Sequence, residues 1–272
     1  MPFTFFHPAA VVPLLRNRLL IPAGLVIGAM SPDFEYFLRL NTISVFTHTP
    51  AGLVYACVPL GLLALVAWQG VIRDPLVGAL PGFLRNRLAG VGTSGIPLGG
   101  REWLVAALSV WIGAATHLLW DSFTHPGYLP ARWLGLTAPS VIPGVPWTGV
   151  LQRSSDLVGF VVLAVVIARL PRQARPAARS AWLFWLVTAV TVVSTLALRT
   201  LLEPDWLTLS RFIATVIAGG LLGLFLAALV ALGQESAAVT RTSRSRGWAV
   251  AAGAGGSQRP ASAATREGPT GL

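Results

Sequence analysis

Five apolar stretches in this sequence are long enough, or nearly long enough, to cross a lipid bilayer, and they limit the possible folds more than any other feature. A transmembrane helix needs about 20 mainly apolar residues. Backbone polar groups in lipid must be paired within the chain, so such spans are helical. We therefore predict an all-α, polytopic membrane helix bundle. Its five clear spans are residues 51–72, 103–123, 156–170, 181–202 and 207–232.

The composition agrees with a membrane protein and argues against a nucleic-acid-binding one. Only 11% of the residues are charged and 54% are hydrophobic, whereas soluble domains carry about 25% charged residues. The net charge is +10, and all twenty basic residues are arginine. They lie between the apolar stretches and in the C-terminal tail, which indicates membrane topology rather than nucleic-acid contact. We predict the lipid bilayer as a partner and no nucleic acid; the sequence does not define an oligomeric state.

The charge of the connecting segments alternates along the chain, as five successive crossings require. The basic segments are residues 73–101, 171–180 and the tail after 240, and the segments 31–49, 121–155 and 203–206 carry five of the ten acids. The positive-inside rule places the basic segments in the cytoplasm. We therefore predict a multi-pass protein of the inner or plasma membrane. Residues 73–101, which are rich in glycine and proline, are predicted to form a loop.

The first 30 residues allow two arrangements. Pro8 suits the first turn of a helix, and Arg16-Asn17-Arg18 interrupts the apolar residues 9–30. One helix could cross the membrane, or two short helices could fold back as a re-entrant hairpin. We favour the hairpin, because it returns His7 to the side of Asp33.

The chain is predicted to have one integral membrane domain and a tail. We assign residues 1–235 to the membrane domain. Residues 236–272 are rich in Ala, Gly, Ser and Arg and have no apolar period, so we predict that they are disordered.

Histidines and aspartates near the ends of the spans are the candidate functional residues. His117 and Asp121 are four residues apart and share one face of a helix. His125 follows four residues later, although Pro126 disfavours helical geometry at that position. Ionisable groups within a membrane span indicate a functional site by default. Four candidates fall on the predicted extracytoplasmic side: Asp33, His48, Asp121 and His125.

Imidazole and carboxylate groups together form the usual ligand set of zinc, and they also suit manganese or iron. The candidate metal ligands are His7, Asp33, His48, His117, Asp121 and His125, which include every histidine of the chain. Non-catalytic interpretations remain open. His117 and Asp121 could form a hydrogen-bonded pair between helices, His125 could be a loop residue, and His48 could cap the next helix. Three acids are interpreted as solvated interface residues: Glu35, Glu203 and Asp205.

Four motifs carry a resemblance to a known family. They are Met1-Pro-Phe-Thr-Phe-Phe-His7-Pro-Ala-Ala10, Gly28-Ala-Met-Ser-Pro-Asp33, Thr47-His48-Thr49 and Gly113-Ala-Ala-Thr-His117-Leu-Leu-Trp-Asp121-Ser-Phe-Thr-His125-Pro126. Over residues 1–235 the chain resembles the uncharacterised bacterial membrane family called domain of unknown function 4184. The family has no established activity, so this resemblance implies a fold rather than a reaction.

A more distant resemblance concerns the chemistry. The order His, Asp, His, His-x-x-x-Asp, His is similar to the ligand order of zinc-dependent phospholipase C, of the related single-strand nucleases and of predicted membrane-bound metal-dependent hydrolases. It implies that all six candidates bind metal. The phospholipases have a further His-x-x-x-Glu pair, which this chain lacks.

The resulting expectation is a metal-dependent hydrolase of the membrane. A divalent metal, zinc before manganese or iron, would activate water for attack on an ester or phosphodiester. A site at the bilayer surface favours a lipid or lipid-linked phosphate as substrate. We expect Asp33 and His125 to take part in catalysis as well as in metal binding. The alternatives are a metal-binding or transport protein without hydrolysis, and a structural helix bundle.

Overall fold

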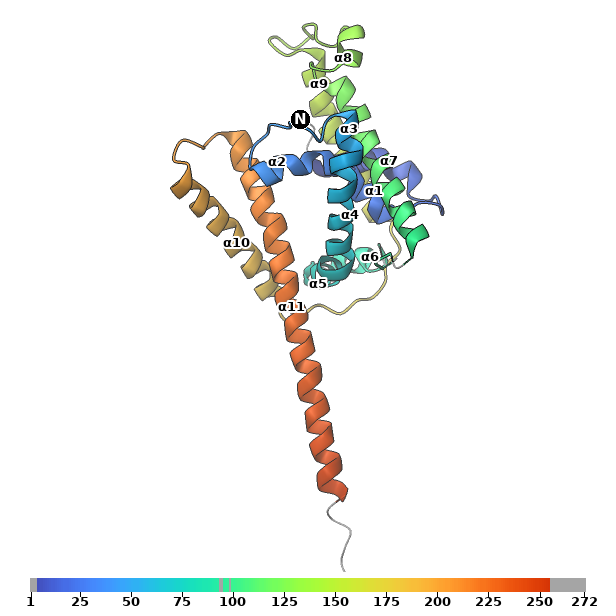
Figure 1. Ribbon diagram of the computed structural model, residues 1–272, viewed down its shortest axis with the longest axis vertical. Coiled ribbons are helices and arrows are strands. Elements are labelled where there is room, and N and C mark those ends of the chain that lie inside the picture. The colour runs from blue at the N-terminus through green and yellow to red at the C-terminus, as the bar shows by residue number, and fades with distance from the viewer. Residues whose placement is uncertain (1–3, 93–94, 98, 255–272) are drawn as a thin grey trace, which may run out of the picture. The chain divides into compact units, whose positions relative to one another are not determined.

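The computed structural model describes residues 4–254 except 93, 94 and 98. Within these residues the regular structure is helical apart from one isolated bridge, Pro139–Pro146, which confirms the all-α prediction (Figure 1). The chain divides into two compact units, residues 1–231 and residues 232–272. The candidate site lies entirely in the first unit.

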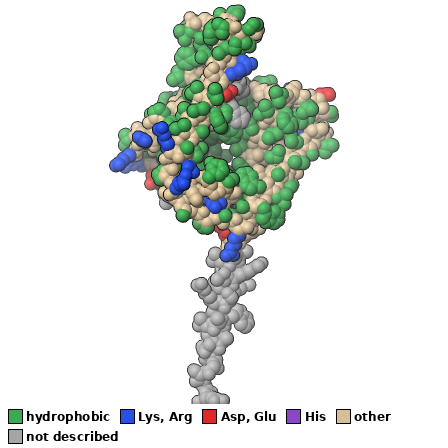
Figure 2. Space-filling view, turned by 180° about the vertical axis from the view of Figure 1, so that it is seen from behind, with side chains coloured by type: hydrophobic (Ala, Val, Ile, Leu, Met, Phe, Trp, Pro, Cys, Tyr) green, Lys and Arg blue, Asp and Glu red, His purple; other side chains and the backbone are tan. Residues whose placement is uncertain are grey.

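The predicted five spans are confirmed as five helical segments long and apolar enough to cross a membrane. They are Pro50–Ala79, Gly100–Trp133, Trp147–Arg169, Ala181–Leu202 and Leu209–Ser236. The third begins earlier than the predicted residues 156–170, and its 23 residues give the length that the apolar stretch alone lacked. Hydrophobic side chains cover most of the face shown in Figure 2, as expected for a surface in contact with lipid.

The first span is built from α3 (Pro50–Gly52), η3 (Leu53–Cys57), α4 (Val58–Ala67), η4 (Trp68–Ile72) and α5 (Arg73–Ala79). The segments η3 and η4 are π-helical turns. Each lies just before a proline, Pro59 or Pro75, whose ring and missing N–H disturb the carbonyl four residues earlier. The prediction of a loop over residues 73–101 was wrong, since α5 and α6 (Gly82–Leu88) occupy much of it. Pro75 and Pro81 stand at the starts of these two helices, where proline is well tolerated.

The N-terminal residues form the hairpin that the sequence favoured. Its arms are η1 (Thr4–Leu14), a 3₁₀-helix, and α1 (Pro22–Gly28). At about 2.0 Å per residue for η1 and 1.5 Å for α1, each arm is shorter than the ~30 Å hydrocarbon core. The chain therefore turns back near Asn17, whose backbone N–H bonds to Leu14. His7 consequently returns to the neighbourhood of Asp33.

Two glycines let α1 and α7 (Gly100–Thr124) cross with their backbones in contact. A Cβ added at Gly28 would lie 2.8 Å from the Val110 Cα, and one added at Gly113 would lie 2.7 Å from the Ala29 backbone N. Small residues permit such close crossings in membranes. α4 also packs against both helices (Figure 1). This crossing sets the distance between the Ala29 carbonyl and the next turn of α7, where His117 lies.

α9 (Trp147–Arg169) and α8 (Leu129–Trp133) follow α7 in the chain. α7 ends at Thr124, and His125 is extended with φ −120° and ψ 132°. This agrees with the predicted effect of Pro126 on the residue before it. α9 packs on η1 through Gly159, where an added Cβ would lie 2.7 Å from the Phe6 Cβ. α7 and α9 thus both pack against η1 of the N-terminal hairpin.

α10 (Ala181–Leu202) and α11 (Leu209–Ala254) form the last pair of helices. Gly219 and Gly223 face α10, since a Cβ at Gly223 would lie 2.9 Å from the Thr188 Cα. α11 continues to Ala254, past the boundary predicted at residue 235 and into the segment expected to be disordered. Alanine is a strong helix former, and an apolar helix already nucleated propagates into an alanine-rich segment. Residues 255–272 of the predicted tail lie outside the described residues.

Candidate metal centre

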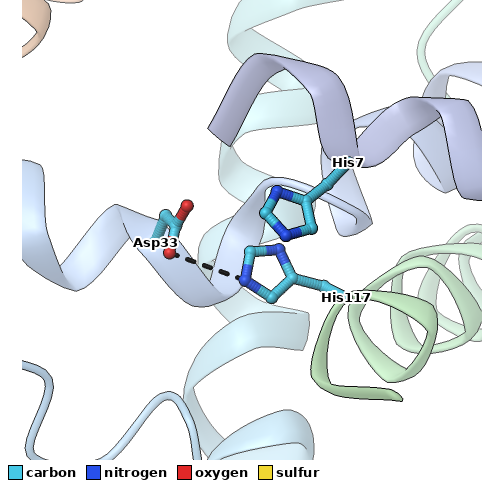
Figure 3. Close-up of side chains that lie close together, drawn as sticks. All are labelled: His7, Asp33 and His117. Atoms are coloured by element: carbon cyan, nitrogen blue, oxygen red, sulfur yellow. Dashed lines mark ion pairs between the residues drawn. The ribbon is translucent and has the colours of Figure 1, made fainter. Parts of the chain in front are cut away.

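Five predicted site residues converge from four segments that are distant in the sequence. They are His7 from η1, Asp33 from η2 (Ser31–Asp33), His48 from the connection before α3, and His117 and Asp121 from α7. The rings of His7 and His117 stack with centroids 3.7 Å apart (Figure 3). In the same view the carboxylate of Asp33 points toward the ring of His117. The hairpin arrangement and the α1–α7 crossing bring these side chains together.

Three imidazole Nε2 atoms face the two carboxylates at similar distances. His7 Nε2 lies 3.3 Å from Asp121 Oδ1, and His48 Nε2 lies 3.4 Å from Asp33 Oδ1. His117 Nε2 lies between the carboxylates, 3.5 Å from Asp33 Oδ1 and 3.3 Å from Asp121 Oδ2. His48 Nε2 is also 3.7 Å from Asp121 Oδ2.

These distances suit atoms that share a metal ion better than atoms that share a proton. Charge-assisted hydrogen bonds between nitrogen and carboxylate oxygen are about 2.7–2.9 Å long. Two ligands at tetrahedral angles, each about 2.1 Å from a zinc ion, are about 3.4 Å apart. Two groups have all their ligand atoms within 4.8 Å of one another: His7, Asp33 and His117, and His48, His117 and Asp121. Either group could supply three ligands to one ion.

The hydrogen bonds of the cluster leave the inward-facing atoms of His117 and Asp33 available. His117 Nδ1 lies 2.8 Å from the Ala29 carbonyl oxygen. A ring that donates there carries its lone pair on Nε2, as metal-ligating histidines usually do. His117 Nε2 and Asp33 Oδ1 are buried and have no hydrogen-bond partner among the described residues. Buried polar atoms are rarely left in this state without a functional reason.

Asp33 is fully buried and is held as a carboxylate. Its Oδ2 accepts a 2.5 Å hydrogen bond from the Thr4 hydroxyl. Burial by itself raises the pKa of Asp33, but the neighbouring imidazoles of His117, His48 and His7 and the hydroxyl of Thr4 lower the pKa below its ordinary value. Thr4 therefore orients one carboxylate oxygen while the other faces the histidines.

His125 lies at the outer edge of the cluster rather than in either three-residue group. Its Nδ1 is 3.5 Å from Asp121 Oδ1 and 3.2 Å from the backbone oxygen of Asp121. Its side chain is 23% exposed and that of His48 is 12% exposed, whereas His7, Asp33 and Asp121 are buried. The cluster is thus accessible from the side of His48 and His125.

Glu35 is a buried anchor for the segment that carries His48, which corrects its interpretation as a solvated interface residue. Its carboxylate accepts hydrogen bonds from the backbone N–H groups of residues 45, 46 and 47 at 3.0–3.1 Å and from the Ser44 hydroxyl at 2.9 Å. Arg39 Nε donates to it at 2.7 Å. Burial alone raises the pKa of Glu35, but the backbone donors outweigh this and hold the pKa well below its usual range.

Thr47 connects this anchor to the cluster. Its Oγ1 lies 2.9 Å from Glu35 Oε2, 2.7 Å from the Pro32 carbonyl oxygen and 3.3 Å from His48 Nδ1. The same hydroxyl thus ties the two segments that carry Asp33 and His48. Glu35 and Thr47 position His48 without reaching the cluster themselves.

Sequence reasoning also missed Tyr36, whose hydroxyl oxygen lies 3.4 Å from His48 Nε2. The side chain is buried, and burial together with the charges of Asp33 and Asp121 raises the pKa of Tyr36. One signal in the sequence could have indicated these residues. Thr4 lies in the motif that carries His7, and Glu35 and Tyr36 directly follow the motif that carries Asp33. Their partners are set by tertiary contacts, which spacing does not reveal.

Comparison with known proteins gives one match. A family model described as a domain of unknown function (DUF4184) matches residues 1–231. These residues coincide with the first compact unit and contain every residue of the cluster. No curated protein and no solved structure matches the chain.

Proposed function

The chain belongs to the DUF4184 family, and we propose that its His/Asp cluster binds a divalent metal, zinc in the first place, and hydrolyses an ester or phosphodiester of a membrane lipid. The observation that carries the proposal is the set of nitrogen–oxygen distances of 3.3–3.5 Å among His7, Asp33, His117 and Asp121. They match the spacing of ligands around one ion.

The donor set also suits the metal. Imidazole and carboxylate ligands favour zinc and also accept manganese or iron, and Cys57 is a member of neither three-residue group. When bound, such an ion supplies a Lewis acid and activates water for attack on an ester. Either His7, Asp33 and His117 or His48, His117 and Asp121 would hold it, because the ligand atoms of each group lie within 4.8 Å of one another.

The residues at the open side of the cluster would handle the substrate. His125 is the most exposed of the four histidines and keeps its Nδ1 near Asp121, so it is placed to transfer a proton to the leaving oxygen. Tyr36, whose hydroxyl oxygen lies 3.4 Å from His48 Nε2, would orient the group being cleaved. We place this side of the bundle on the extracytoplasmic face of the plasma or inner membrane, in line with the arginine-rich segments opposite.

The experiment is elemental analysis of the purified protein, followed by hydrolysis assays with a nitrophenyl phosphodiester and with phospholipid in mixed micelles. We expect at least one equivalent of metal in the wild type and almost none in His117→Ala or Asp121→Ala. Hydrolysis should be lost with the metal. Thr191→Ala in α10, remote from the cluster, is the control and should keep both.

Three results would contradict parts of the proposal. A wild type without stoichiometric metal would reject the metal site and favour histidines that only pair helices. Bound metal without hydrolysis of any of these substrates would reject the enzyme. In that case uptake of the metal by proteoliposomes would identify a transport protein.

A further inference from the structure

A mainly apolar pocket lies between α7, α9 and η1, at the same level along α7 as the metal cluster. Its volume is about 380 Å³. It is lined by Ala10, Thr116, Leu119, Trp120, Phe123, Thr124, Leu151 and Ser155. The α7 residues of this lining span the same two turns that carry His117, Asp121 and His125.

The polar side chains of the lining already have partners within the protein. Thr116 Oγ1 donates to the Gly113 carbonyl at 2.7 Å, and Trp120 Nε1 donates to Ser155 Oγ at 3.0 Å. Thr124 Oγ1 lies 3.2 Å from His125 Nδ1 and 3.4 Å from the Trp120 carbonyl oxygen. The pocket therefore offers a ligand chiefly methyl, aliphatic and ring surface, which suits hydrocarbon and disfavours a polar headgroup.

The wall of the pocket is continuous with the cluster. Thr124 lines the pocket, and its Oγ1 lies 3.2 Å from His125 Nδ1. Ala10 stands one 3₁₀ turn after His7 on η1, so the two residues share a face of that helix. A molecule whose apolar part fills the pocket would meet the open side of the cluster with its next polar group.

We expect the mouth of the pocket to face the bilayer. α7 and α9 are both among the five helices that could cross a membrane. On α7, Leu119 is 62% exposed and Phe123 is also exposed, so that these lining residues would contact lipid. A hydrocarbon chain could enter sideways without leaving the membrane.

We propose that this pocket holds one hydrocarbon chain of a membrane phospholipid and thereby presents the ester or phosphodiester next to that chain to His125 and the metal cluster. The inference rests on the proposed function and names its substrate as a bilayer phospholipid. It predicts that the enzyme distinguishes substrates by their chain and not only by the group that is cleaved.

The test uses the full-length protein in vesicles of phosphatidylethanolamine and phosphatidylglycerol that contain a phospholipid with a photoreactive diazirine in one acyl chain. After illumination, mass spectrometry should find the label concentrated on residues 116–124 and 151–155. Leu151→Trp fills the pocket and should reduce that labelling about tenfold, the effect of 1.4 kcal/mol on binding. Leu157→Trp, on the lipid-exposed side of the same helix, is the matched control and should leave the labelling unchanged.

Labelling spread evenly over α7, α9, α10 and α11 would overturn the inference, because it would show only the lipids that surround any membrane protein. Equal labelling of Leu151→Trp and the wild type would do the same. Since the readout is binding, it stands apart from catalysis. Pocket labelling in a protein that fails to hydrolyse would reject the enzyme but keep the lipid site.

A hydrolysis assay can reject the chain-binding pocket while it keeps the proposed hydrolase. Leu151→Trp should lose activity toward long-chain phospholipid while it keeps its metal and its activity toward the soluble nitrophenyl phosphodiester. If Leu151→Trp hydrolyses both the long-chain phospholipid and the soluble phosphodiester at wild-type rates, the cluster is catalytic but the pocket does not bind the substrate's hydrocarbon chain.

Discussion

Two regions of the membrane unit are held together by different kinds of contact. The site region, made of residues 4–48 and α7, buries charged and hydrogen-bonding side chains such as His7, Asp33 and His117. The paired-helix region, made of α10 and residues 209–231 of α11, packs through glycines against threonines. Its buried cation, Arg199, donates to the Leu40 carbonyl and to Thr215 Oγ1 and lies 4.6 Å from the Trp206 ring.

The contrast shows what each region is organised for. Small residues in close contact hold membrane helices together at no cost in buried charge. Buried ionisable groups are expensive in a membrane and are kept where they bind or react. In the site region several buried ionisable side chains, His7, Asp33, His117 and Asp121, converge on one cluster. Arg199 by contrast is a single buried cation that ties its helix to the end of α2 (Phe34–Arg39), and its Nε has no hydrogen-bond partner among the described residues.

Removal of the metal should produce the largest difference in stability between the site region and the paired-helix region. A ligand at about 1,000 times its dissociation constant stabilises a protein by about 4 kcal/mol, so a chelator should lower the thermal unfolding midpoint markedly. Hydrogen exchange should rise in α7 and η1 and stay unchanged in α10. Equal exchange in all three helices, with or without chelator, would show that no metal organises the site region.

The glycine contacts offer a second comparison. Gly113→Ala should destabilise the protein by about 3 kcal/mol, because the new methyl group overlaps the α1 backbone in a packed crossing. It should also reduce metal content by displacing His117. Gly220→Ala is the matched control, since a Cβ there meets nothing within 4 Å. Thermal unfolding and elemental analysis measure both effects, and similar midpoints for the two variants would contradict the close crossing.

Substitution of a carboxylate in each region should sharpen the contrast further. Glu35→Gln removes an acceptor from three backbone donors and should cost about 2 kcal/mol. Because Glu35 positions the segment of His48, metal affinity should fall about 10- to 100-fold. Glu203→Gln, an exposed residue beside Arg199, is the control and should change neither quantity. Competition with a chromogenic chelator measures the affinity, and wild-type affinity in Glu35→Gln would rule out the positioning role.

The smallest expected effect concerns pH. The pKa of Glu35 is lower in the folded protein than its unfolded value of about 4.3. Its contribution to stability is therefore present above that value and is lost as the pH falls toward the folded pKa. The difference in unfolding midpoint between wild type and Glu35→Gln should be constant from pH 7 to 5 and shrink below pH 4.3. A difference that grows on acidification would contradict the assignment.

Much of the fold could be predicted because its causes are local in the sequence. Span length follows from bilayer thickness, and His117 and Asp121 share a face because of the helical period. The end of α7 at Thr124 follows from Pro126. The residue types that cluster could also be predicted, since the chain has four histidines and aspartates stand near them in the sequence.

The remaining features depend on tertiary contacts. From the sequence Glu35 is interpreted as a surface acid, because its hydrogen bonds to the backbone N–H groups of residues 45–47 form only in the folded protein. The helices α5 and α6 form in a segment whose glycines and prolines suggest a loop, because the prolines fall at helix starts. The extension of α11 to Ala254 depends on a helix nucleated upstream.

The fold-back of His7 onto α7 also has a consequence for biosynthesis. His7 and Asp121 are 114 residues apart, which a ribosome takes on the order of ten seconds to synthesise. Throughout most of that time His7 has emerged and its partners on α7 have not. In the proposed metal site an ion would therefore be bound only after α7 has been inserted, so the compartment that the end of α7 reaches would decide which ion the protein receives.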